Sequence, residues 1–187
     1  MSVKKLFFSS LLSLGLLHAQ SSIGLDINND DIEVLAAINL NTYADYSDST
    51  TYIIDGSYLH TDGDNLSTIG LSGENTFQGI QGLALAFGVK GVFASDFFAV
   101  PLFGKAVYAL PLNDSIPTTS VSTSLAYAPS VLTFRDGESY TEFRLEADME
   151  IISNIHLFAG YRNIDTEYDR YDKNFNSSFY GGMKLSF

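Results

Sequence analysis

Residues 140–151, with the sequence YTEFRLEADMEI, alternate between apolar and charged side chains. The apolar parity holds Phe143, Leu145, Ala147, Met149 and Ile151, and the charged parity holds Glu142, Arg144, Glu146, Asp148 and Glu150. Successive side chains of a strand point to opposite faces, whereas on a helix these charges would surround the axis. The stretch therefore predicts a β-strand with one apolar face and one charged face.

The same period of two recurs along the rest of the chain. Nine further segments of strand length carry it, separated by clusters of Asp, Asn, Ser and Gly: residues 23–28, 32–40, 51–60, 66–75, 83–93, 98–110, 121–134, 155–164 and 179–187. After the first 19 residues, no apolar stretch reaches the roughly 18 residues expected of a transmembrane helix. The pattern predicts an all-β chain with about ten strands.

Composition excludes several function classes. The chain has 187 residues, a net charge of −12 and no Cys, so it lacks a basic surface for nucleic acid and has no disulfides or thiolate metal sites. Aromatic residues make up 13% of the chain and charged residues 17%, which argues against disorder. The length suits one folded domain.

Residues 1–19 have the pattern of a secretory signal peptide. Lys4 and Lys5 precede an apolar run, and Ala19 provides a small residue at the expected cleavage point. Loss of these two lysines would leave 8 basic residues against 22 acidic ones. We expect an exported, acidic domain over residues 20–187.

The alternation fits two kinds of barrel with opposite orientations. In a soluble lipocalin-like barrel the apolar parity points inward, and in an outer-membrane barrel it faces lipid while the charges line the interior. The predicted interior charges are Asp26, Glu33, Asp55, Glu74, Glu142, Glu146, Asp148 and Glu150 against Lys90, Lys105, Arg144, Arg162 and Lys184. The apolar parity is nearly free of charge, and aromatic residues lie near segment ends on it, namely Tyr52, Tyr58, Phe93, Tyr108, Tyr127, Tyr161 and Phe179. Both observations favour lipid contact.

A sheet that crosses lipid has to close, because unpaired backbone groups are costly in hydrocarbon. We therefore predict a closed antiparallel up-and-down transmembrane β-barrel with ten strands, eight being the alternative, in a bacterial outer membrane. Three connections are acidic and polar, and we expect them on the extracellular side: residues 62–65, 135–138 and 165–176.

Several short motifs, in order along the chain, resemble the YfaZ family of predicted outer-membrane proteins. They are Gly56-Ser57-Tyr58-Leu59-His60 followed by Asp62-Gly63-Asp64, then Gly88-Val89-Lys90-Gly91-Val92-Phe93, Phe158-Ala159-Gly160-Tyr161-Arg162-Asn163 and Tyr180-Gly181-Gly182-Met183-Lys184-Leu185-Ser186-Phe187. The chain differs in residues 43–48 and in having no Trp. The resemblance implies an outer-membrane barrel, sometimes called porin-like, and no established substrate or catalytic residues.

The end of the chain resembles the assembly signal of bacterial outer-membrane barrels. Phe187 closes a parity of outward-facing residues, and the predicted signal is Phe179, Met183, Leu185 and Phe187. The partners expected from this interpretation are outer-membrane lipid and the barrel assembly machinery.

We expect no enzymatic activity, cofactor or metal site. After the leader only His60 and His156 remain, on different predicted strands and near opposite barrel ends, and no Ser–His–Asp arrangement is recognisable. The acidic connections lack the spacing and closing Glu of an EF-hand.

Two functions remain open for the predicted outer-membrane barrel. Eight acidic against five basic interior residues would leave an excess of negative charge, which favours a narrow, wet, porin-like lumen that prefers small cations or other small solutes. Alternatively, the same charges form an ion-pair network that plugs a structural barrel. A periplasmic lipocalin-like binder with reversed faces is the alternative to both.

Overall fold

Ten antiparallel strands form a closed barrel, and two short strands are added at one end. The computed structural model describes residues 21–43, 49–112, 116–168 and 171–187; the predicted signal peptide lies outside these ranges. The barrel strands are β1 (Ser22–Ile27), β2 (Asp31–Asn39), β3 (Thr51–Thr61), β4 (Asp64–Thr76), β5 (Leu83–Phe93), β7 (Leu102–Ala109), β8 (Thr119–Ala128), β10 (Gly137–Ile152), β11 (Ile155–Tyr168) and β12 (Tyr171–Ser186). The short strands are β6 (Phe97–Ala99) and β9 (Thr133–Arg135), and the 3₁₀ turns are η2 (Leu40–Thr42) and η3 (Ser130–Leu132).

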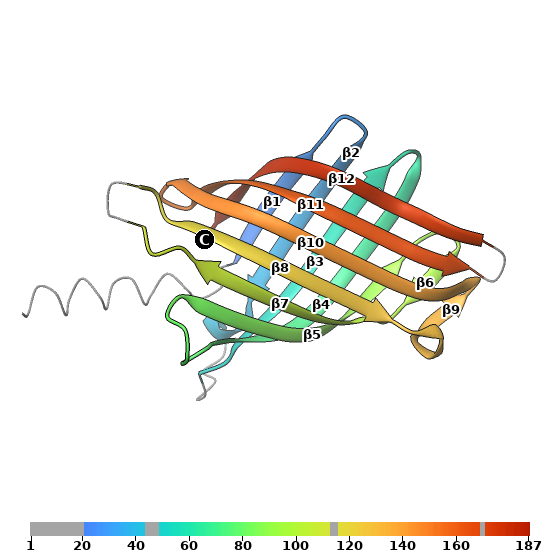
Figure 1. Ribbon diagram of the computed structural model, residues 1–187, viewed down its shortest axis with the longest axis horizontal. Coiled ribbons are helices and arrows are strands. Elements are labelled where there is room, and N and C mark those ends of the chain that lie inside the picture. The colour runs from blue at the N-terminus through green and yellow to red at the C-terminus, as the bar shows by residue number, and fades with distance from the viewer. Residues whose placement is uncertain (1–20, 44–48, 113–115, 169–170) are drawn as a thin grey trace, which may run out of the picture.

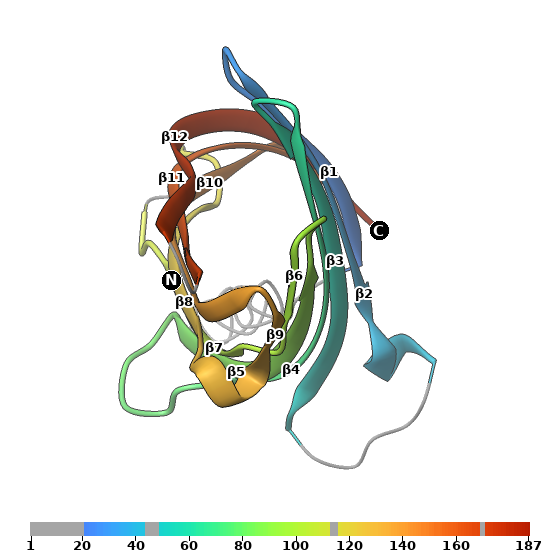
Figure 2. The ribbon, with the colours of Figure 1, turned by 90° about the vertical axis from the view of Figure 1, so that its right-hand side faces the viewer.

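The ring closes through two pairings. Going round the barrel, the order is β4, β3, β2, β1, β12, β11, β10, β8, β7 and β5, and β5 pairs with β4 (Figures 1 and 2). The first and last strands pair from Ser22↔Ser186 to Ile27↔Gly181. The predicted ten-stranded up-and-down barrel is confirmed, and both chain ends of the barrel lie at one end, which we call the terminal end. The opposite end is called the distal end.

Two predicted strands are interrupted near the distal end because of proline. Residues 98–110 form two strands, β6 and β7, which pair with β5 in the same register. The pairing is interrupted at Val100 and Pro101, since Pro101 has no N–H to donate. The prediction for residues 121–134 is wrong beyond Ala128: Pro129 begins the turn η3, and the chain returns as β9 to pair with β6. The small β6–β9 ladder folds over one side of the distal opening (Figure 2).

The prediction of a loop over residues 165–176 is also wrong. Strands β11 and β12 continue as a hairpin through the pairs Asp165↔Asn174 to Tyr168↔Tyr171. Asn174 Nδ2 donates to Asp165 Oδ1 at 2.7 Å, so the polar side chains that suggested a loop bond across the ladder instead. Phe175 is the extra residue of a β-bulge between Asn174 and Asn176, and the bulge turns its side chain into the interior.

The other two acidic connections are tight and lie at the distal end. Asp62 and Gly63 join β3 to β4 with φ of 46° and 85°, the pair of positive values that a type I′ hairpin turn requires. Arg135, the last residue of β9, has φ of 66°, and Asp136 links it to β10. All three acidic connections therefore share the end opposite the termini.

The apolar parity faces outward. Phe143, Leu145 and Met149 are 37%, 46% and 37% exposed, whereas Glu142 on the same strand is 2% exposed. Exposed Ile, Leu, Val and Phe residues occur on the outer side of nearly every barrel strand. The lipocalin-like alternative, which needs the apolar parity inside, is therefore wrong.

A lysine on the outer face should destabilise the barrel more than one on the inner face. Leu145→Lys should destabilise the folded barrel in phospholipid vesicles by about 2–4 kcal/mol, because a charge would meet hydrocarbon. Ser122→Lys is the matched control, since Ser122 faces inward opposite Glu146 in the β8–β10 register. Urea titration in vesicles measures the stability of both variants. Equal destabilisation would contradict the placement of Leu145 on the lipid-facing side and Ser122 on the inner side.

Candidate functional site

The barrel interior is the candidate site, and it receives all thirteen predicted interior charges. Five are buried: Asp26, Glu33, Glu74, Glu142 and Arg162. Asp55, Lys90, Arg144, Glu146, Asp148, Glu150 and Lys184 are partly buried on the same face of their strands. Lys105 is exposed, and its register neighbours Ala86 and Ser124 share the inward parity.

An ion-pair network crosses the interior. Arg144 on β10 donates to both carboxylate oxygens of Glu33 on β2, at 2.7 and 2.9 Å, and to Glu142 at 2.6 Å. Lys90 on β5 contacts the other oxygen of Glu142 at 3.0 Å, where Tyr140 also donates at 2.8 Å. We call Glu33, Lys90, Glu142, Arg144 and Arg162 the cross-lumen network, because it joins strands on opposite sides of the ring.

Arg162 on β11 is fully buried and holds three carboxylates. It bonds to Glu33 and lies 3.6 Å from Asp26 and 3.5 Å from Asp31. Both carboxylate oxygens of Asp26 lack a hydrogen-bond partner among the described residues. Asp26 is therefore the least satisfied charge in this part of the interior, since a buried carboxylate without hydrogen bonds is costly.

Asp31 is an interior residue that the sequence analysis missed. It accepts from Asn176 at 2.8 Å and from Ser178 at 2.9 Å, and so ties the start of β2 to β12. The predicted strand began at Ile32, one residue too late. Asp31 has the same parity as Glu33, and that signal could have identified it.

An apolar cluster fills the interior on the distal side of the network. It contains Leu59, Leu66, Val92, Phe97, Ala99, Ala128, Tyr140, Ile164, Tyr168 and Phe175. The Phe97 ring from β6 packs against Tyr140 and Tyr168, with ring centroids 6.0 Å apart in each case. Apolar side chains occur on the inward parity near the distal strand ends, and this signal in the sequence could have predicted the cluster.

Toward the terminal end the interior is more open. Asp148 contacts His156 at 2.7 Å and Lys184 at 2.6 Å, and the Lys184 side chain is 28% exposed. Among the described residues, no salt bridge joins Asp55, Lys105 or Glu150 to another side chain. The inward side chains are therefore apolar and buried toward the distal end, and charged and partly exposed toward the terminal end.

A layer of aromatic rings lies between the cross-lumen network and the charges around Asp148. Phe158 and Tyr180 pack edge to face at 6.2 Å, with Arg162 5.1 Å from the Tyr180 ring centre and Lys184 5.9 Å from that of Phe158. Gly160 makes room for this layer, because a Cβ there would lie 2.6 Å from the Tyr180 hydroxyl. The rings can thus lie against the barrel wall.

The two histidines do not form a shared site. His60 is on the outer face and contacts Asn65 at 2.7 Å, whereas His156 is inside near the terminal end. In the described ranges, no group of three or more His, Asp or Glu residues is arranged to hold a metal ion. The same ranges contain no helix long and apolar enough to cross a membrane.

The predicted assembly signal lies on the outer face of β12. Phe179, Met183 and Leu185 are exposed there, and Phe187 is exposed directly after the strand ends at Ser186. Leu185 pairs with Ile23 of β1 and Met183 pairs with Leu25, so these two residues lie on the ladder that closes the ring.

Together, the closed sheet, the apolar outer face and the charged interior define a small outer-membrane-type β-barrel. A family model described as "YfaZ precursor" matches residues 3–187, and the chain belongs to this family. A solved structure described as "Bacterial polysaccharide outer membrane secretin" is similar at a TM-score of 0.50 and 11% identity, over 84% of this chain and 56% of that one. The chain spans little more than half of that protein, and the likeness concerns the fold alone. No curated protein matches.

Removing the carboxylate that Arg144 and Arg162 share should destabilise the barrel strongly. Glu33→Gln leaves Arg144 and Arg162 without their shared anion, and the free energy of unfolding should fall by about 3–5 kcal/mol. Glu150→Gln is the control, because the Glu150 side chain accepts only from the Asn154 N–H among the described residues, and a glutamine oxygen can still accept that bond. A change under about 0.5 kcal/mol is expected. Urea unfolding in micelles measures the free energy of unfolding of both variants. Similar losses in the two would contradict a stabilising role of the network.

Proposed function

We propose that this chain is a structural outer-membrane barrel of a Gram-negative bacterium whose interior is plugged by its own side chains. The observation that carries the proposal is the contact of Arg144 on β10 with Glu33 on β2, across the ring. The apolar cluster around Phe97 supports it, because it fills the interior distal to that contact. Two successive barriers of different chemistry oppose the passage of solutes.

Aromatic residues at both barrel ends support a membrane location. Phe93, Phe98 and Phe134 stack in a row on the outer face near the distal end, with centroid distances of 4.9 and 5.5 Å. Tyr52 and Tyr108 lie near the terminal strand ends. Aromatic girdles at the two interfaces are typical of outer-membrane barrels. The distal end, with its acidic connections, would face outside the cell.

A narrow porin-like pore that prefers cations is the second candidate. Asp31 adds a ninth acidic residue to the eight predicted interior acids, against the same five basic residues. The partly accessible Glu146, Asp148 and Glu150 toward the terminal end would attract small cations. This candidate requires both the ion-pair network and the apolar cluster around Phe97 to open.

Planar-bilayer recording distinguishes the two candidates. The unmodified protein should give no steady conductance if the interior is plugged. The double variant Phe97→Ala/Arg144→Gln should give cation-preferring channel events, because both barriers lose a central side chain.

The matched control for the bilayer experiment is Phe98→Ala/Lys105→Ala. Phe98 is the outward neighbour of Phe97, and Lys105 has no salt bridge among the described residues. Steady conductance by the unmodified protein would favour the pore, and anion preference in the opened variant would contradict the acidic-lumen argument. Heat-dependent electrophoretic mobility should verify that every variant is folded.

We further propose that Phe179, Met183, Leu185 and Phe187 are recognised by the barrel assembly machinery. Phe187→Ala should reduce the amount of folded barrel in cells, while folding into pure lipid vesicles changes little. Ile23→Ala is the control, because Ile23 is an exposed neighbour of Leu185 on β1. Equal losses in cells for the two variants would contradict a specific signal.

A further inference from the structure

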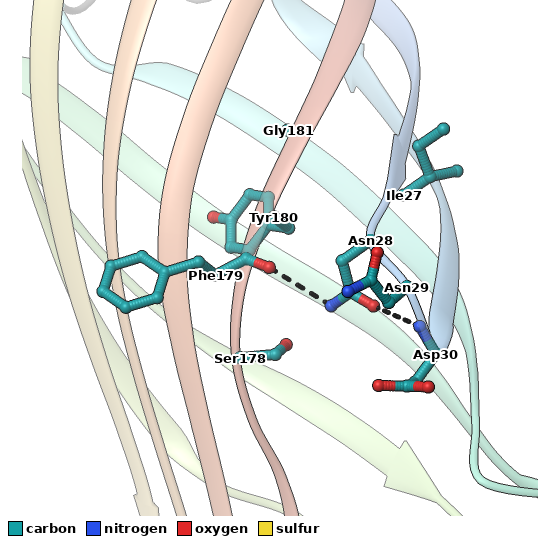
Figure 3. Close-up of a pocket in the computed structure, with 8 residues that line it drawn as sticks. All are labelled: Ile27, Asn28, Asn29, Asp30, Ser178, Phe179, Tyr180 and Gly181. Carbon is teal, nitrogen blue, oxygen red and sulfur yellow. Dashed lines mark hydrogen bonds between the residues drawn. The ribbon is translucent and has the colours of Figure 1, made fainter.

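The seam between the first and last strands is open on its distal side. The pairing of β1 with β12 stops at Ile27↔Gly181, although β12 continues to Tyr171. A shallow cavity of about 470 Å³, widely open to the outside, lies where β1 ends. It is lined by residues 27–30 on one side and 178–181 on the other (Figure 3).

Hydrogen bonds fix the walls of this cavity. Asn28 Nδ2 donates to the Phe179 carbonyl at 3.2 Å, and Asn28 Oδ1 accepts from the Asp30 N–H at 2.8 Å (Figure 3). Asn28 Nδ2 also donates to Asp31 at 2.6 Å, and Ser178 donates to the same carboxylate at 2.9 Å. The turn and the strand are therefore held at a set separation.

Other groups at the cavity remain available to a ligand. The side chains of Asn29 and Asp30 are exposed and make no hydrogen bond or ion pair within the described residues. Phe179 is 79% exposed and Ile27 55%. The N–H and C=O of a strand residue point to the same side, so the Phe179 N–H also faces the seam, beyond the reach of β1.

The chemistry of the lining selects among ligands. None of the eight lining residues is Lys, Arg or His, so the cavity lacks the cations that bind phosphate. Asp30, Asn29 and the strand edge offer both acceptors and donors, as hydroxyl groups require. The exposed Phe179 ring and Ile27 offer an apolar surface directly beside these polar groups.

We propose that this seam cavity binds the neutral sugar headgroup of a glycolipid in the outer leaflet, with its acyl chain against Ile27 and Phe179. The inference rests on the proposed outer-membrane location, with the distal end outside. Under that location the cavity lies at the boundary between hydrocarbon and headgroups, where aromatic residues gather.

NMR titration of the folded protein in zwitterionic micelles tests the proposal. The probe is octyl-β-D-glucopyranoside, and octyl tetraethylene glycol ether is the comparison, because it has the same alkyl chain without a sugar. We expect saturable shifts of the Asn29, Asp30 and Phe179 amides with the glucoside alone. Equal shifts with the ether would overturn the proposal in favour of a non-specific apolar groove.

Two pairs of variants assign the effect to the cavity. Phe179→Leu and Asp30→Asn should each weaken glucoside binding on the order of five-fold, through loss of the ring or of the carboxylate. The controls Phe93→Leu and Asp62→Asn change an exposed ring and an exposed carboxylate near the same end of the barrel, outside the cavity. Equal weakening by a control and its partner would overturn the assignment.

A titration with Ca²⁺ distinguishes a sugar ligand from a cation at this cavity. Shifts of the same amides by Ca²⁺, with no response to the glucoside, would replace the sugar by a cation and overturn the proposal. Binding in micelles requires only a folded barrel, so a conductance result against the plugged interior leaves this test unaffected. Failure of glucoside binding likewise leaves the bilayer experiment intact.

Discussion

The whole structure depends on the pairing of β1 with β12. That short ladder converts an open sheet with two unpaired edges into a ring, in which barrel backbone groups bond to neighbouring strands. Closure also creates an inside and an outside, and the period of two then assigns every side chain to one or the other. The apolar outer face and the charged interior are two consequences of this one constraint.

Closure of the barrel buries charged side chains, and the interior network gives most of them partners. Charges sealed inside a narrow barrel need partners, and the chain supplies them from strands that are distant in sequence, such as Glu33 with Arg144 and Arg162. Asp26 is the incomplete case, near Arg162 but without hydrogen bonds. The aromatic layer of Phe158 and Tyr180 separates this network from the more open charges around Asp148.

The two ends of the barrel therefore differ in character. The distal end combines an apolar cluster with the ion network beneath it, whereas the terminal end leaves acidic side chains partly accessible. The same distal region contains the one stretch of the seam where β12 extends past β1. The recognition site that we propose therefore lies on the barrel wall and does not depend on whether the lumen is open.

The sequence by itself indicated a barrel of ten strands, with eight as the alternative, and it determined which parity is apolar and which carries the charges, because a strand's alternation is local and can be read without knowing its neighbours. It did not determine the distal cluster, the place of Asp31 or the hairpin over residues 165–176. Which inward charge meets which depends on the order and register of strands around the ring, and Pro101, Pro129 and the bulge at Phe175 set local geometry that alternation does not encode. Only the closed tertiary structure brings Glu33 and Arg144 together, because their contact spans the barrel and not a segment of the chain.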